Sequence, residues 1–163
     1  MKCKLCLKDK LLIKSHIIPD FMYRNLFDEN HQIHKINFLD NDKIHAKKIP
    51  TGTYDQNILC SDCDNAIIGP YENYAKMIIY GGDVLVKDNP SFQRMKNQNG
   101  LESMRISNVN YTKFKLFLLS LLFRGSVTSQ ILFKDVKLNL KMKKRLGKCY
   151  LMGMLVILTI IRA

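Results

Sequence analysis

The sequence predicts an α+β fold, in which a small module organised by cysteines precedes a mostly helical C-terminal part. Two Cys-x-x-Cys pairs are separated by a long stretch of mixed and polar sequence, and two later segments carry apolar residues at helical spacing. The composition, with 47% hydrophobic and 25% charged residues, lies in the range of globular proteins. We divide the chain into a cysteine module at residues 1–82, a connecting segment at 83–110, a helical region at 111–140 and an atypical tail at 141–163.

The cysteine module is predicted to contain little regular structure between its cysteine pairs. Asp20 to Leu26 is expected to form a helical turn, and residues 27–56, rich in Asn, Asp, Lys and His, are predicted to form a loop or an irregular insert. A helix is expected to begin at Asp64, directly after the second pair. Gly69 and Pro70 are expected to interrupt it, because proline lacks the amide donor and disfavours a helical residue before it.

Two further helices follow from apolar periodicity. From Tyr71 to Tyr80 apolar residues recur at helical spacing, and Gly81 and Gly82 supply a stop signal. The strongest helix is predicted from Tyr111 to Arg124, because its apolar residues cover most of the circumference and should place it in the core. The segment between these helices, residues 83–110, mixes Gly, Asn, Pro and Ser and is predicted to form strands or loops.

Four of the five cysteines form the most specific pattern in the sequence. A Cys-x-x-Cys turn lets two thiolates reach one ion, and two such turns complete the tetrahedral site that zinc prefers. We therefore predict one structural Zn²⁺ held in a treble-clef-like arrangement by Cys3, Cys6, Cys60 and Cys63. Because four thiolates leave no open coordination position, catalysis needs a second site. Cys149 lies outside both pairs and is expected to be a buried small residue.

Around these cysteines the sequence resembles zinc-stabilised HNH endonucleases. The resemblance covers residues 1 to about 80 and rests on the order of Cys3-x-x-Cys6, Lys14-Ser15-His16-Ile17-Ile18-Pro19 and Asn57-Ile58-Leu59-Cys60-x-x-Cys63-Asp64-Asn65. It implies a ββα-metal fold and a nuclease that hydrolyses phosphodiester bonds by water attack beside a divalent ion. A closer resemblance is to uncharacterised bacterial HNH-like proteins that combine a CxxC, a Ser-His-Ile-Ile-Pro segment and a later apolar helix, which is Tyr111 to Arg124 in this chain.

The resemblance implies roles for individual residues. His16 occupies the position of the general base, and a neutral imidazole suits that task near pH 7. Asp64 stands where the family has a metal-ligating histidine, and its carboxylate suits Mg²⁺ or Mn²⁺. Asn57 is the weaker candidate for the asparagine of the family site. Ser15 stands where the family has a carboxylate and is a poorer ligand than that group.

Simpler interpretations of these residues stay open. His16 is nearly as well interpreted as a histidine that only hydrogen-bonds inside the zinc module, and Asp64 as a helix N-terminal residue favoured by the helix dipole. The alternative function is a non-catalytic zinc-binding module that recognises nucleic acid or a protein partner. Ser15 and the absence of the closing histidine favour that alternative, so the sequence leaves the assignment as an enzyme open.

Charge and the N-terminal sequence give expectations about partner and location. The formal net charge of +12 favours an anionic partner, most often nucleic acid, and a solvated lysine-rich surface is the alternative. From Lys134 onward eight Lys or Arg residues accompany a single Asp135, so about +5 remains for residues 1–133. No apolar stretch of signal-peptide length opens the chain, which predicts a cytoplasmic location.

The tail at 141–163 differs in character from the rest of the chain. Its nearly all-apolar run at 149–161 is shorter than the roughly 20 residues needed to cross a bilayer, so no membrane span is predicted. Back-translation of the segment from Lys148 in a shifted frame permits a polar, turn-forming sequence. We therefore interpret the tail as the product of a frameshift that truncates the chain.

Overall fold

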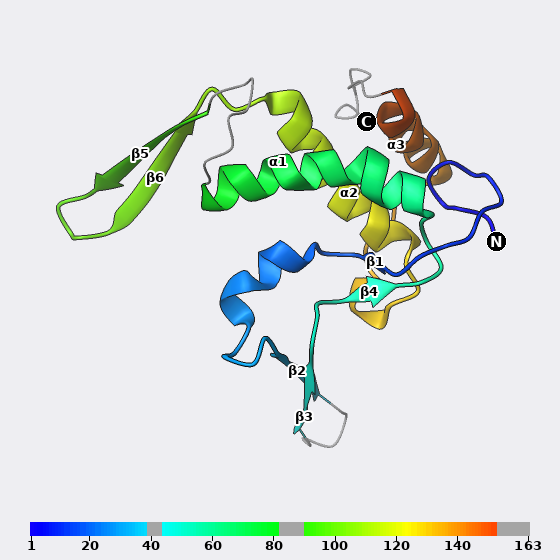
Figure 1. The fold of residues 1–163 in the computed structure, drawn as a ribbon, viewed down its shortest axis with the longest axis horizontal. Helices are drawn as coiled ribbons and strands as arrows, with labels where there is room; N and C mark the ends of the chain where they lie inside the picture. The colour runs from blue at the N-terminus through cyan, green and yellow to red at the C-terminus, as the bar shows by residue number, and fades with distance from the viewer. Residues whose placement is uncertain (39–43, 82–89, 153–163) are drawn as a thin grey trace.

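The computed structural model describes residues 1–38, 44–81 and 90–152, and these form an α+β protein (Figure 1). The elements are, in chain order, β1 (Ser15–His16), a 3₁₀ helix (Asp20–Leu26), β2 (Ile33–Phe38), β3 (Ile44–Ile49), β4 (Tyr54–Asp55), a π-helical segment (Asp62–Ile68), α1 (Gly69–Tyr80), β5 (Ser91–Lys96), β6 (Glu102–Ser107), α2 (Tyr111–Val127), a 3₁₀ turn (Ile131–Phe133) and α3 (Leu140–Met152). The predicted fold class is confirmed, with the cysteine cluster near the N-terminus and a helical C-terminal part.

A short strand pair and a long helical run form the frame of the N-terminal half. β1 and β4 pair antiparallel, with Ser15 opposite Asp55 and His16 opposite Tyr54. An isolated bridge between Leu12 and Cys60 continues the contact toward the second cysteine pair. The helical run, residues 62–80, begins with the next element after β4, so β1, β4 and this run form the frame, with a 3₁₀ helix, β2 and β3 inserted between the two strands.

The helical run passes through Gly69 and Pro70 without a break, and the predicted interruption is wrong. Gly69 has helical angles (φ −48°, ψ −44°), and its amide donates to the carbonyl oxygen of Asp64, five residues back. The wide π turns from Asp62 to Ile68 end there, and α1 begins with proline in its first turn. Pro70 therefore stands where the wider π turns give way to the α-helix, and its ring does not end the helical run.

Residues 27–56 are more regular than predicted. β2 and β3 form an antiparallel ribbon paired along its whole length, from Ile33 opposite Ile49 to Phe38 opposite Ile44. The ribbon lies between β1 and β4 in the chain and projects away from the helices (Figure 1). The prediction of an irregular insert is wrong because cross-strand pairing, which no local pattern in this polar segment reveals, determines these strands.

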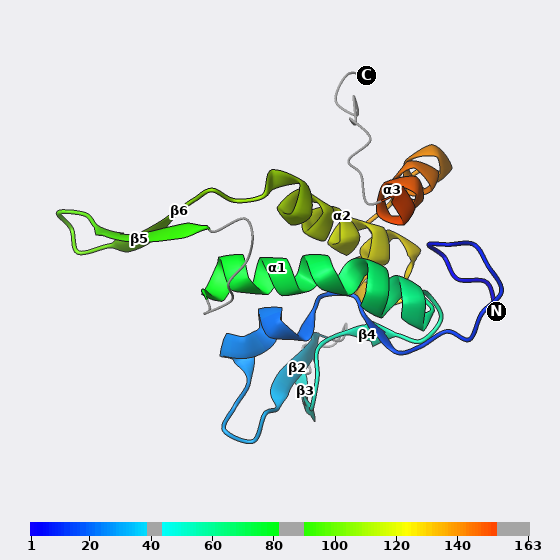
Figure 2. The same cartoon turned by 45° about the horizontal axis from the view of Figure 1, so that its top comes forward.

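The connecting segment forms a second ribbon. β5 and β6 pair in register from Ser91 opposite Ser107 to Lys96 opposite Glu102, which agrees with the strands or loops predicted there. The ribbon extends from the end of the molecule where α1 ends and α2 begins (Figures 1 and 2). Ile106 anchors its base against a small buried cluster on α1.

The main core lies between the cysteine turn and the three helices. α1 and α2 run side by side, and α3 lies at the N-terminal side of the molecule beside the cysteine turn (Figures 1 and 2). The fully packed residues of this core are Cys3, Leu5, Ile58, Leu59, Cys60, Cys63, Ile68, Leu116, Phe123, Leu146, Cys149 and Tyr150. The phenol of Tyr150 donates a 2.6 Å hydrogen bond to the carbonyl oxygen of Leu116 and so joins α3 to α2.

The first part of the predicted tail is a folded helix. α3 begins at Leu140 and packs on the core through Leu146, Cys149 and Tyr150, and the burial of Cys149 is as predicted. Residues 153–163, which carry most of the apolar run, lie outside the described residues. Within the three described ranges no helix combines the length and the apolarity that a bilayer crossing requires.

Candidate functional site

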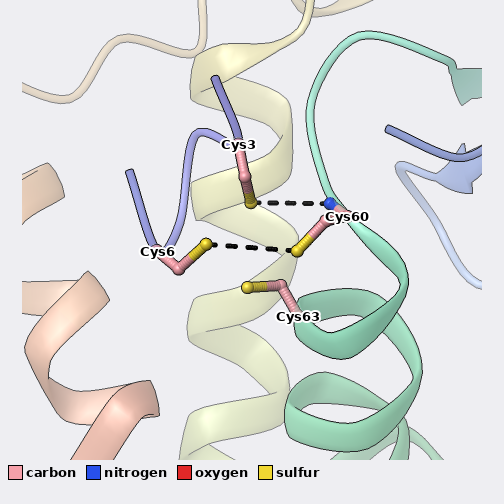
Figure 3. A group of neighbouring side chains, drawn as sticks. All are labelled: Cys3, Cys6, Cys60 and Cys63. Atoms are coloured by element: carbon pink, nitrogen blue, oxygen red, sulfur yellow. Dashed lines mark hydrogen bonds between the residues drawn. The ribbon is translucent and has the colours of Figure 1, made fainter. Parts of the chain in front are cut away.

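The four cysteines converge from two distant segments of the chain (Figure 3). Their sulfur atoms all lie within 4.8 Å of one another, and Sγ of Cys6 is 4.0 Å from Sγ of Cys60. A tetrahedral zinc ion with Zn–S bonds of about 2.3 Å separates its sulfur ligands by about 3.8 Å. Four closely spaced thiols at these distances can hold a metal ion such as zinc.

Backbone hydrogen bonds bring the two cysteine turns together. The amide of Leu7, a residue in the left-handed region (φ 60°), donates to the carbonyl oxygen of Cys3 and closes the N-terminal turn. The amide of Cys3 in turn donates to Lys8 O at 3.0 Å. The amide of Lys4 donates to Ile58 O at 2.8 Å, just before the second pair. The four cysteines are therefore positioned by main-chain contacts.

The environment of the thiols differs from one cysteine to the next. Burial alone would raise the pKa of the Cys3 thiol, but hydrogen bonds from the backbone at Cys6 and Cys60 outweigh it and lower that pKa to about 7. Burial and the neighbouring thiols raise the pKa of Cys63. The amide of Cys60 lies 3.5 Å from Sγ of Cys3 and donates to it. Such amide–sulfur contacts favour thiolate, the form that binds metal.

A second site lies beside the first turns of the long helical run. A pocket of about 320 Å³ is lined by His16, Pro19, Asp20, Phe21, Asp64, Glu72, Asn73, Lys76 and Arg124. Its walls come from the segment after β1, the helical run and α2. The structure thus brings His16 and Asp64, separated widely in the sequence, into one cavity.

His16 is partly buried in this pocket, and one nitrogen of its ring is hydrogen-bonded. Nε2 of His16 lies 2.6 Å from Oγ1 of Thr51, and 31% of the histidine side chain is exposed. Burial lowers the pKa of His16 below its ordinary value, which the Asp20 carboxylate opposes and the Lys14 ammonium reinforces. At pH 7 the imidazole is therefore neutral and able to accept a proton.

Asp64 is the carboxylate whose acidity the pocket changes most. Burial raises the pKa of Asp64 from 3.8 to about 6; the charge of Arg124 opposes this rise, and that of Glu72 adds to it. A carboxylate with this pKa is costly to keep ionised at neutral pH, because the protein removes much of its water and the charge of Arg124 offsets only part of that loss. A bound cation would remove that cost.

Arg124 joins the elements of the pocket, and its role was not predicted from the sequence. Only 1% of its side chain is exposed; Nη1 lies 2.7 Å from Oε1 of Glu72 and donates to His16 O at 2.8 Å. The guanidinium also donates to the hydroxyl of Ser120, one turn earlier on α2. The signal that could have revealed it is a single cation in the apolar part of α2 that follows Lys115, four residues after Ser120.

The remaining predicted residues lie outside the pocket lining. Ser15 lies in β1 and is fully buried. The side chain of Asn57 is exposed, and its backbone amide donates to Asp55 Oδ1 at 2.8 Å. Asp55 is itself buried, and its other oxygen accepts hydrogen bonds from Oγ1 of Thr128 at 2.7 Å and from the amide of Ser129 at 3.1 Å. Asp55 therefore fastens β4 to the end of α2.

No protein-family model, curated protein or solved structure matches this chain. Within the described residues, the four cysteines are also the single set of three or more His, Cys, Asp or Glu side chains whose ligand atoms cluster within metal-binding range. Functional inference consequently depends on the chemistry of the two sites themselves, the cysteine centre and the His16 pocket.

Proposed function

We propose that the chain is a metal-dependent nuclease of the HNH type, which cleaves phosphodiester bonds by water attack. The observation that carries the proposal is that His16 and Asp64, on separate elements, line one pocket next to the cysteine centre. Asp64 directly follows Cys63, so the metal centre that organises the fold also sets the position of this carboxylate.

In this proposal His16 is the general base. Its neutral ring accepts a proton from the attacking water, a task that imidazole performs well near pH 7. Arg124 supports that role by holding the main chain of His16 in place from α2, while β4 holds the same strand from its other side. The position of the base is thus determined by two elements besides its own.

Zinc at the four cysteines is proposed to be structural. A set of four thiolates fills the coordination sphere of a tetrahedral ion and leaves no place for water or substrate. In this proposal the ion joins the N-terminal turn to the start of the helical run, where Asp64 lies. Loss of zinc would then disrupt the pocket without removing any residue from it.

A divalent cation such as Mg²⁺ or Mn²⁺ is proposed to bind at Asp64. When bound, such an ion neutralises the charge that develops on the scissile phosphate and on the leaving oxygen. Mg²⁺ usually keeps several waters and takes only one or two protein carboxylates. The donor chemistry of Asp64 fits this requirement, and the elevated pKa of its carboxyl group indicates that a cation would be favoured there.

The proposed substrate is a nucleic acid, and a basic groove next to the pocket supports this. A cavity of about 440 Å³ is lined by Lys14, Lys47, Lys48, Ile49, Pro50, Thr51, Gly52, Thr53, Tyr54 and Gln130. Thr51 belongs to this groove and contacts His16 at the same time. A phosphate backbone that follows the lysines therefore leads to the histidine.

A plasmid-nicking assay tests the proposal. The zinc-loaded full chain should nick supercoiled plasmid with added Mg²⁺ or Mn²⁺ and should be inactive when neither ion is added. His16→Ala should lower the cleavage rate by at least a hundredfold, while His34→Ala, at an exposed histidine on β2, should cleave like the wild type. Equal rates for the wild type and His16→Ala would refute the mechanism.

A second candidate is a zinc module that binds nucleic acid without cutting it. The observation in its favour is Ser15, which is fully buried where HNH nucleases place a carboxylate. This candidate predicts binding that weakens with salt and no cleavage with any divalent ion. The same assay, combined with a gel-shift titration, therefore separates the two functions.

A further inference from the structure

The ring of His16 has a hydrogen-bond partner that comes from the end of the β2–β3 ribbon. Oγ1 of Thr51 lies 2.6 Å from Nε2 of His16 and donates a 3.1 Å hydrogen bond to Oδ1 of Asp20. Asp20 begins the 3₁₀ helix four residues after the histidine, and its Oδ1 is 4.0 Å from the same ring nitrogen. The histidine, the hydroxyl and the carboxylate thus form a short chain of contacts.

The direction of these contacts follows from counting protons. A threonine hydroxyl carries one proton, and an ionised carboxylate can only accept. Because the hydroxyl gives its proton to Asp20, its oxygen can only accept from His16. Nε2 must then carry the ring proton, and in a neutral imidazole the other nitrogen, Nδ1, keeps a free lone pair.

We propose that Thr51 and Asp20 are positioning residues that hold neutral His16 as its Nε2–H tautomer and leave Nδ1 as the basic atom. The catalytic consequence rests on the proposed nuclease function, whereas the tautomer is a property of the folded chain alone. The ribbon inserted between β1 and β4 thereby gains a role, since its last strand leads directly to the residue that orients the base.

The surroundings of Thr51 keep it in place. The next residue, Gly52, packs so closely on Tyr23 that a Cβ atom would come within 2.1 Å of the tyrosine ring. The amide of Thr53 donates to the phenol oxygen of the same tyrosine at 3.4 Å. The loop that carries Thr51 therefore packs against the 3₁₀ helix that carries Asp20.

Nitrogen-15 NMR of the full zinc-loaded chain at pH 8 tests the inference. The ring signals of His16, identified by their loss in His16→Ala, should show a protonated Nε2 and an unprotonated Nδ1 in the wild type. Thr51→Ser keeps the hydroxyl and should preserve this pattern. Thr51→Val removes the hydroxyl at nearly constant volume and should give a mixture of both tautomers. A predominantly Nδ1-protonated ring in the wild type, or an unchanged pattern in Thr51→Val, would overturn the inference.

Asp20→Ala provides the sharpest variant. Without its acceptor, the hydroxyl of Thr51 is free to donate to Nε2, so the ring should switch toward the Nδ1–H tautomer. Thr53→Val, which makes the same chemical change two residues from Thr51, should leave the ring signals as in the wild type. A wild-type pattern in Asp20→Ala would contradict the proton assignment.

Cleavage kinetics separate this inference from the proposed function. Thr51→Val should lower kcat roughly tenfold or more with KM nearly unchanged, and Thr51→Ser should restore most of the rate. The expected tautomers together with an absence of cleavage in the wild type would support the positioning inference and count against the nuclease. A fully active Thr51→Val chain would count against the role of Thr51 in positioning the base.

Discussion

The cysteine centre and the His16 pocket lie next to each other and differ in the side chains that form them and in their exposure to solvent. The centre consists of four cysteines from two local turns, three of them buried, whose sulfur atoms lie close enough together to hold one metal ion. The pocket uses a histidine, carboxylates and an arginine from β1, the helical run and α2, and it is open to solvent. The centre can stabilise the fold and cannot admit a substrate, whereas the pocket can admit one at some cost in stability.

The two sites separate stability from chemistry in this chain. When four thiolates bind one metal ion, the ion neutralises their negative charge, so their burial is favourable. In the pocket, burial raises the pKa of Asp64 by more than the charge of Arg124 lowers it, so the ionised carboxylate is unfavourable in the folded protein. A costly arrangement of this kind is typical of sites that bind a ligand. Four predictions test the contrast, beginning with the largest effect.

Removal of one metal ligand should unfold the chain. Cys60→Ser leaves three thiolates, and small zinc modules are commonly unfolded without metal. We expect loss of most helical circular dichroism at 25 °C and less than one zinc per chain by elemental analysis. Cys149→Ala, at a buried cysteine outside the cluster, should bind one zinc and stay folded. A Cys60→Ser chain as stable as the zinc-loaded wild type would contradict a structural role for the centre.

Replacement of Arg124 should come next in size. Arg124→Met keeps the length of the side chain but removes the ion pair with Glu72 and the hydrogen bond to His16 O. Breaking a buried ion pair leaves an uncompensated charge, so we expect the free energy of unfolding in urea to fall by about 3 kcal/mol. Arg105→Met, on the exposed β6, should change it by less than about 0.5 kcal/mol. Equal free energies of unfolding for the two variants would contradict the conclusion that Arg124 connects the elements of the pocket.

The cysteine centre and the His16 pocket also differ in how far the sequence predicts them. The Cys-x-x-Cys turns are local, so the spacing of Cys3, Cys6, Cys60 and Cys63 predicts the cluster directly. Arg124 and Thr51 act on His16 across long stretches of chain, through contacts that no local pattern records. Helices with strong periodicity were likewise predicted, while the β2–β3 ribbon was not, because its pairing is set by cross-strand partners.

Replacement of Asp64 should raise stability and lower activity. The pKa of Asp64 is about 6 in the folded chain, whereas its ordinary value is 3.8. Between these two pH values the folded state binds more protons than the unfolded state, so the folded chain loses stability as pH rises through 6. In the zinc-loaded protein without added Mg²⁺ or Mn²⁺, Asp64→Asn should therefore raise the free energy of unfolding by about 1 kcal/mol at pH 7.5. The gain should vanish below about pH 4, where both side chains are neutral.

A matched carboxylate in the same turn provides the control for Asp64. Asp62 is exposed and forms an ion pair with Lys10, which lowers its pKa. Asp62→Asn should therefore give no gain in stability at pH 7.5 and should leave cleavage intact. If Asp64→Asn destabilises the chain at neutral pH, the carboxylate is a structural group, and the contrast between the two sites fails at this residue.

The smallest effect is expected at Asn57, the weaker of the predicted cofactor-binding residues. Its side chain is exposed and outside the pocket lining. The hydrogen bond that Asn57 donates to Asp55 comes from its backbone amide, which alanine also has. Asn57→Ala should change the free energy of unfolding by less than about 0.5 kcal/mol and leave plasmid nicking at the wild-type rate. Asp55→Ala, by contrast, removes the acceptor for Thr128 and Ser129 and should destabilise the chain by about 2 kcal/mol. A large loss of cleavage in Asn57→Ala at unchanged stability would place this side chain in contact with the substrate or its metal, and the pocket would then have to extend past β4.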